Sequence, residues 1–156
     1  MGELDLIDRK ILAELMRDAT IPIARLADRV GLSQTPCWKR IQKLEALGVM
    51  TGRVAVVDPA RLGLALSAFV AVEAAEHGAE WRVGFAAAVA AFPEIVEAHR
   101  MAGDPDYLLK VVLPDMAAYD DFYRRFTGVV PLRNVTTSFV LERMKSAPYP
   151  LDTVNR

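Results

Sequence analysis

The segment from Gly31 to Glu45 carries side chains whose types and spacing suit the reading of duplex DNA. Its polar residues recur at helical spacing, so they share one face of an expected helix and offer hydroxyl, aromatic, cationic and amide groups. Those residues are Thr35, Trp38, Lys39 and Gln42. Such groups near a helix N-terminus can form hydrogen bonds and apolar contacts with base edges in the major groove. The pattern therefore predicts a recognition helix.

The neighbouring polar side chains are assigned to the phosphate backbone. Contacts to phosphates fix the register of a protein on DNA without reading its sequence. We expect these contacts from Gln34, Arg40, Lys43 and Arg53. Ser33, a good helix N-cap, and Pro36 complete the candidate DNA-binding set at the start of the helix.

The opposite face of the same helix is apolar and includes the single cysteine. Cys37, Ile41, Leu44 and Leu47 form this stripe. A helix N-terminus can activate a thiol, which would suit redox or nucleophilic chemistry. A cysteine on an apolar stripe more often packs as a small hydrophobe, and this is the favoured interpretation of Cys37.

A second group of chemically capable residues surrounds Gly103. Asp104 and Asp106 could bind a metal or act as an acid–base pair, but no histidine stands at metal-ligand spacing. Gly-Asp-Pro-Asp is also an ordinary turn sequence. An intermediate hypothesis is that Gly103 lets backbone amides approach a ligand carboxylate while Asp104 or Asp106 faces its ammonium group. Thr137 and Ser138 would add hydroxyl groups to this site.

Three short helices must position the candidate recognition face. The apolar periodicity predicts helices from Leu4 to Leu15, from Pro22 to Val30 and from Ser33 to Leu47, with Asp5 as the first cap. Gly31 can adopt the positive φ of a tight turn between helices. Three short helices with these connections predict a winged helix-turn-helix head, and residues 54–57 are expected to form a short strand after it.

The rest of the chain alternates strand and helix patterns in the order β-α-β-β-α-β. The expected segments are residues 66–73, 81–92, 95–101, 107–113, 115–126 and 135–144. This order predicts an α+β protein whose second part is a ferredoxin-like sheet with helices on one face. The expected organisation is a DNA-binding domain at residues 1–52, a strand and linker at 53–65, and a ligand-binding and oligomerisation domain at 66–156.

Composition and charge restrict the remaining possibilities. The 156 residues are 53 % hydrophobic and 25 % charged, which is typical of a globular protein. The net charge of −1 means that any DNA affinity must come from local placement of cations. One cysteine excludes an intramolecular disulfide, and we expect no export signal, no membrane partner and a cytoplasmic location.

Three segments together resemble the Lrp/AsnC family of feast/famine transcriptional regulators. They are residues 4–12, residues 30–45, and the loop Gly103-Asp104-Pro105-Asp106-Tyr107 with the two leucines that follow. The resemblance covers nearly the whole chain. It implies a ligand domain of the RAM/ACT-like kind and an amino-acid effector near the Gly103 loop. The effector residues then expected are Arg100, Met101, Gly103, Asp104, Pro105, Asp106, Tyr107, Thr137 and Ser138.

The resemblance also implies partners. It implies binding to double-stranded operator DNA and pairing of the C-terminal sheets into homodimers that assemble into octamers. Residues 35–40, 100–103 and 135–139 resemble a branch that controls cysteine detoxification, which points to a sulfur-containing amino acid as effector. Members of the leucine-responsive branch commonly have an apolar residue at the position of Arg100. This difference argues against leucine as the effector.

Two other classes of function compete with this one. A small-molecule sensor that uses its N-terminal head for protein contacts would share the same fold. An enzyme would need a nucleophile with its base, a phosphate loop or a metal cluster, and the sequence has none of these patterns. We therefore expect no catalytic residues, no metal site and no cofactor.

Overall fold

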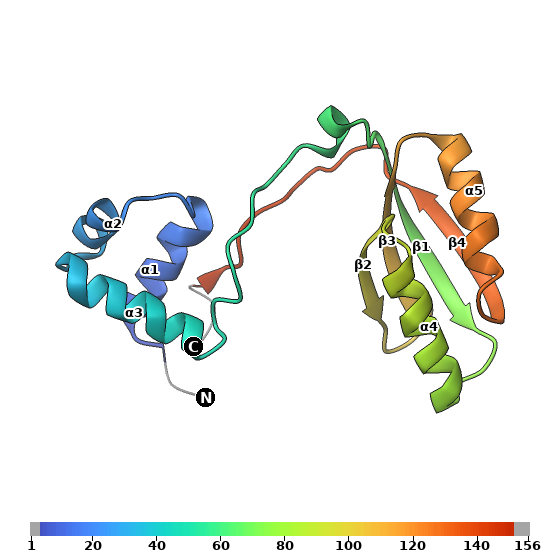
Figure 1. The fold of residues 1–156 in the computed structure, drawn as a ribbon, viewed down its shortest axis with the longest axis horizontal. Helices are drawn as coiled ribbons and strands as arrows, with labels where there is room; N and C mark the ends of the chain where they lie inside the picture. The colour runs from blue at the N-terminus through green and yellow to red at the C-terminus, as the bar shows by residue number, and fades with distance from the viewer. Residues whose placement is uncertain (1–3, 152–156) are drawn as a thin grey trace. The chain divides into compact units, whose positions relative to one another are not determined.

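A computed structural model describes residues 4–151 of the chain (Figure 1). The chain divides into two compact units. The first unit, called the head, contains the residues up to Val56 and also those from Lys145 onward. The second unit, called the sensor unit, spans Val57–Met144. Each unit has its own hydrophobic core, so each is described by itself.

Three helices form the head, as the apolar periodicity predicted. They are α1 (Leu6–Arg17), α2 (Ile23–Val30) and α3 (Gln34–Ala46). The Asp5 carboxylate caps α1 by accepting hydrogen bonds from the backbone N–H groups of Ile7 and Asp8. Gly31 ends α2 with φ +74°, the left-handed conformation that the turn into α3 requires.

One side of each of the three helices packs into the hydrophobic core of the head. Cys37 is completely buried there, and burial raises the pKa of its thiol, which confirms the packing interpretation. Leu47 does not continue the stripe as expected. Because α3 ends at Ala46, the Leu47 side chain is 47 % exposed.

The predicted strand at residues 54–57 is wrong. Residues 51–58 have no regular structure, and Val54 and Val56 are 84 % and 94 % exposed. Alternating valines favour a strand, but a strand also needs hydrogen bonds to a partner strand, and residues 51–58 form no such pairing within the described chain. A short 3-10 helix, η1 (Pro59–Leu62), follows this extended segment.

The sensor unit has the β-α-β-β-α-β order that was predicted. Its sheet has the strand order β2-β3-β1-β4, and all neighbouring strands are antiparallel. The elements are β1 (Leu66–Ala74), α4 (Ala79–Ala91), β2 (Ile95–Arg100), β3 (Tyr107–Leu113), α5 (Met116–Thr127) and β4 (Leu132–Phe139). The last strand therefore begins and ends earlier than the 135–144 expected from the sequence.

Both helices of the sensor unit cover the same face of its sheet. Phe85 of α4 and Phe126 of α5 pack together against the inward residues of β1 and β3, including Val70 and Val111. The alternate residues face away from the helices. Phe69 on this open face is 40 % exposed, so the expectation of one uncovered sheet face is confirmed.

The C-terminal segment from Lys145 onward belongs to the head. The sequence had assigned this segment to the ligand-binding domain, which was expected to extend over residues 66–156. Leu151 packs against the core of the head, and its carbonyl oxygen accepts a hydrogen bond from Arg9 Nη1 at 3.1 Å. No periodic pattern marks this segment, so its return to the head could not be foreseen. The outer ends of the two expected domains, residues 1–3 and 152–156, lie outside the described residues. No helix within residues 4–151 is long and apolar enough to cross a membrane.

Candidate DNA-binding and ligand-binding sites

The exposed face of α3 presents most of the predicted DNA-binding residues together. Cys37 and its apolar neighbours point into the head, and the polar residues half a turn away are open to solvent. The exposed set comprises Ser33, Gln34, Thr35, Pro36, Trp38, Lys39 and Gln42. Lys39 makes no hydrogen bond or ion pair within the described part of the chain. Its ammonium group is therefore available to an anionic partner.

Trp38 lies at the edge of this face and not in the core. Its side chain is 51 % exposed, as predicted from its place off the apolar stripe. It borders a shallow groove together with Gln42 and apolar residues such as Ile21 and Ile23. One side of the indole thus rests on the head while the other remains free for contact.

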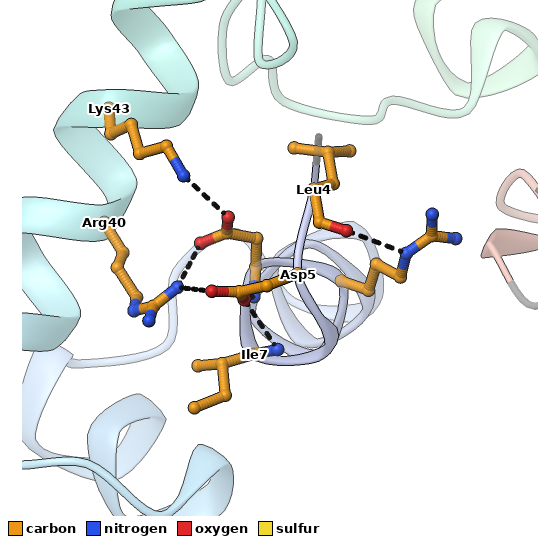
Figure 2. Close-up of polar contacts among 7 residues, drawn as sticks. Leu4, Asp5, Ile7, Arg40 and Lys43 are labelled. Carbon is orange, nitrogen blue, oxygen red and sulfur yellow. Dashed lines mark hydrogen bonds and ion pairs between the residues drawn. The ribbon is translucent and has the colours of Figure 1, made fainter. Parts of the chain in front are cut away.

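Arg40 and Lys43 point toward α1 instead of outward with Lys39 (Figure 2). Arg40 Nη1 donates to a carboxylate oxygen of Asp5 and, at 2.8 Å, to Oδ1 of Asp8. Lys43 Nζ donates to Oδ2 of Asp8 at 3.0 Å. These four residues form what we call the α1–α3 charge network.

Asp8 is the buried centre of the α1–α3 charge network. Its side chain is fully inaccessible, whereas those of Arg40 and Lys43 are 29 % and 48 % exposed. Burial by itself would raise the pKa of Asp8, but the hydrogen bonds from the two cations outweigh burial and lower it. Asp5 also has a lowered pKa, mainly through the backbone N–H of Asp8 and then through Arg40, whose own pKa is raised.

Arg53, the last of the predicted phosphate contacts, lies in the extended segment after α3. Its guanidinium is 3.6 Å from a carboxylate oxygen of Glu45, and both side chains are about half exposed. An exposed pair of this kind is weak and exchanges readily with other ions. The contact leaves Arg53 accessible.

In the sensor unit, the loop between β2 and β3 is closed by backbone contacts. Gly103 has φ +121°, and the Asp104–Pro105 peptide bond is cis. The N–H of Met101 donates to the carbonyl of Asp106 at 2.8 Å. Asp106 also accepts a hydrogen bond from the N–H of Ala74 through Oδ2 at 2.8 Å, so it joins this loop to the end of β1.

A small polar pocket lies beside this loop, where β1 ends and α4 begins. Four of the predicted effector residues line it: Arg100, Met101, Asp106 and Tyr107. Four further residues were not predicted: Glu76, His77, Trp81 and Arg82. The pairing of β1 with β3, in which Val72 stands opposite Tyr107, brings the two segments together. Reasoning from one sequence motif could not find the second group.

The charges around this pocket are of both signs. Arg100 has no hydrogen bond or ion pair with any residue from 4 to 151 through its side chain. His77 Nδ1 is 3.9 Å from Asp106 Oδ1, the oxygen that does not bind Ala74. The pocket lining therefore combines the free guanidinium of Arg100 with the carboxylates of Glu76 and Asp106.

The remaining predicted effector residues are not part of this pocket. Gly103, Asp104 and Pro105 lie in the adjoining loop but do not line it. Thr137 and Ser138 are neighbours on a strand, so they point to opposite faces of the sheet. Thr137 accepts a hydrogen bond from the Tyr119 hydroxyl at 2.7 Å, on the helix-covered face. The structure therefore does not bring these two hydroxyl groups together, because successive residues of a strand alternate between its faces.

Residues 4–151 contain no group of three or more His, Cys, Asp or Glu residues that could hold a metal ion. The two aspartates of the loop have different surroundings. Asp104 is exposed, and Asp106 is partly buried against β1. They do not form a paired carboxylate centre.

Comparisons with known proteins match both units. The AsnC-type helix-turn-helix domain matches residues 4–45, and the Lrp/AsnC ligand binding domain matches residues 67–150. The DNA-binding transcriptional activator DecR of Escherichia coli K12 is 46 % identical over 143 residues, which cover 91 % of this chain and 94 % of that protein.

Two solved structures have the same fold over almost the full length. The crystal structure of an AsnC family transcriptional regulator from Agrobacterium tumefaciens has a TM-score of 0.91 and 48 % identity, and it covers 96 % of this chain and 99 % of its own. A transcriptional regulator from Neisseria meningitidis, solved as a complex with L-Met, also has a TM-score of 0.91, with 32 % identity and coverage of 96 % and 98 %.

Proposed function

This chain belongs to the Lrp/AsnC family of transcriptional regulators, and we propose that it reads duplex DNA through the exposed face of α3 and responds to a small amino acid held in the pocket beside Asp106. The main support for the proposal is that the same chain has both of these surfaces. The head exposes an unpaired cation among hydrogen-bonding groups, and the sensor unit exposes charges of both signs around a pocket. This protein acts on DNA in the cytoplasm and binds its ligand without converting it.

Lys39 is central to the proposed DNA contact because it is the unpaired cation on the exposed face of α3. We expect Lys39→Ala to weaken operator binding and to lower the slope of log affinity against log salt by about 0.9 if the lysine neutralises one phosphate. If Lys39 contacts a guanine instead, affinity will fall more for the preferred sequence than for random DNA. Fluorescence anisotropy with a duplex selected by the wild-type protein measures both quantities.

Lys10→Ala is the matched control for this measurement. Lys10 is an exposed lysine on α1, outside the α3 face. It carries the same charge, so its removal corrects for the general attraction between the head and DNA. Equal effects of the two substitutions would remove Lys39 from the proposed contact set.

The pocket in the sensor unit suits the two charges common to all free amino acids. We assign the ligand carboxylate to Arg100, because an unpaired guanidinium binds carboxylates through two parallel hydrogen bonds. The ligand ammonium group is assigned to Glu76 and to Oδ1 of Asp106, the oxygen that does not bind Ala74. Met101 leaves one apolar wall for a short side chain. A sulfur-containing amino acid fits this proposal, and the L-Met complex of the Neisseria relative supports it.

Arg100→Met tests the ligand assignment. Removal of a charge-assisted hydrogen bond costs about 1.5–3 kcal/mol, so affinity is expected to fall by about 10- to 150-fold. Isothermal titration calorimetry with L-methionine and with L-cysteine under reducing conditions measures the affinity. Arg143→Met, at an exposed position after the sheet, is the control. Undiminished affinity in Arg100→Met would contradict the assignment.

The open face of the sheet supports a second part of the proposal, which is self-association. Phe69 is 40 % exposed in the middle of β1, and sheets rarely leave such a face uncovered in water. A second copy of the same face would cover it, giving a homodimer that can assemble further into an octamer. Two heads per dimer would then address two half-sites on one duplex. Sedimentation equilibrium gives the mass that tests this.

A further inference from the structure

The side chains of Arg40 and Lys43 lie three residues apart on α3, yet they have different relations to the buried carboxylate of Asp8. Arg40 Nη1 binds Asp8 Oδ1 and also Asp5, and its side chain is 29 % exposed. Lys43 Nζ binds the other oxygen of Asp8 and is 48 % exposed. Figure 2 shows the two cations approaching the carboxylates from the same side of α3.

A buried carboxylate must keep a cation beside it. Asp8 is the one buried charged side chain among residues 4–151, and an ionised carboxylate without a partner is very unfavourable in such a place. If Arg40 turned away toward a DNA phosphate, Asp8 would keep Lys43, but Asp5 would lose its cation. If Lys43 turned away, Arg40 would still neutralise Asp8. The two cations are therefore not interchangeable.

The Arg40 contacts also join the recognition helix to the start of α1. Asp5 is the cap of α1 and Asp8 lies in its first turn, so both carboxylates have fixed positions. A guanidinium that bridges them fixes one flank of α3 at a defined distance from α1. The exposed face with Thr35, Lys39 and Gln42 is presented from that fixed flank.

We propose that Arg40 is a positioning residue, which orients α3 through Asp5 and Asp8 and does not contact DNA, while Lys43 exchanges from Asp8 to a DNA phosphate. This inference rests on the proposed reading of DNA by α3. It revises the expectation that both side chains are phosphate contacts, and it gives Asp8 a function in recognition although Asp8 is inaccessible to DNA.

The salt dependence of DNA binding separates the two roles. Removal of one phosphate contact lowers the slope of log affinity against log salt by about 0.9, whereas a disturbed helix orientation lowers affinity and leaves the counterion-releasing groups in place. We expect Lys43→Met to lower the slope by this amount. Arg40→Met leaves Lys43 as the remaining cation beside Asp8, so this variant is expected to weaken binding by about tenfold and also to lower the slope by about 0.9. Asp5→Asn separates the two roles, because Arg40 then stays beside Asp8 and Lys43 stays free to exchange.

The measurement uses the full chain and a duplex selected from random sequences by the wild-type protein, with anisotropy recorded over a series of KCl concentrations. Arg40→Lys keeps a cation near Asp8 and is expected to recover most of the affinity. Affinity equal to wild type in Arg40→Met would overturn the proposal. Lys39→Ala is measured in parallel. If Lys39→Ala binds DNA as tightly as wild type, the proposed DNA contact of the exposed α3 face is wrong, and this result does not bear on the role of Arg40.

Asp5→Asn is the decisive variant, and it also covers the case in which Arg40→Met does not fold. Asparagine is as good an N-cap as aspartate, so this variant retains α1 and removes only the charged contact with Arg40. Asp5 cannot release a DNA counterion itself. We expect Asp5→Asn to weaken operator binding without lowering the slope, and unchanged affinity for the operator would contradict the role given to Arg40.

Discussion

Phe126→Ala is expected to destabilise the sensor unit by about 3–5 kcal/mol and to abolish the ligand response at 37 °C. Phe126 is completely buried, stacks on Phe122 with ring centroids 5.5 Å apart, and meets Phe85 and Phe92 at their edges. Truncation removes an aromatic ring from the centre of this group and leaves a cavity. A loss of this size is a large part of the total free energy of unfolding of a small domain, so few such domains would stay folded.

The effect should remain within one unit because the two hydrophobic cores share no residue. Native-state hydrogen exchange can show this. Amide protection is expected to fall in β1, β3 and α5 and to persist in α1 and α3. Val83→Ala, at a 71 % exposed position on α4, should change stability by less than about 0.5 kcal/mol. An equal decrease of protection in the head would contradict the independence of the two cores.

Asp8→Asn is expected to destabilise the head by about 3 kcal/mol at neutral pH. The loss of hydrogen bonds to a charged group costs about 1.5–3 kcal/mol, and the upper end applies because Asp8 accepts hydrogen bonds from both Arg40 and Lys43. Thermal unfolding followed by circular dichroism at several pH values measures the change. Asp28→Asn, an exposed aspartate on α2, is the matched control.

The pH dependence of this difference has a definite sign. The folded head lowers the pKa of Asp8 and Asp5 below the ordinary value of 3.8. Between that value and the lower folded pKa, the unfolded chain binds more protons, so stability rises with pH. The contribution is fully present above the ordinary pKa and disappears as pH falls through the folded pKa. Wild type and Asp8→Asn should therefore converge in acid, and a constant difference would contradict the ion-pair origin.

The sequence predicted the elements that depend on local chemistry. Asp5 as a cap, Gly31 as the turn and Cys37 on a buried stripe follow from side-chain type and helical spacing alone. The β-α-β-β-α-β order followed from changes in periodicity. Membership of the Lrp/AsnC family followed from segments 4–12, 30–45 and 103–109 taken together.

Features that depend on a distant partner were not predictable in the same way. A cation on α3 attracts a phosphate or an internal carboxylate equally well, so the sequence could not show that Arg40 faces Asp8. The valines at 54 and 56 favour a strand, but only a neighbouring chain segment decides whether one forms. Glu76 and His77 join the proposed ligand pocket through strand register and not through spacing from the Gly103 loop.

The return of the C-terminal segment to the head makes the DNA-binding domain discontinuous in sequence. The sensor unit is thus an insertion between two pieces of one domain, and the polypeptide passes between the units twice. A single proteolytic nick within residues 51–58 would leave the two units covalently joined. A fragment that stops after the three helices would expose the surface that Leu151 covers, so dissection of this protein at one point cannot recover an intact head.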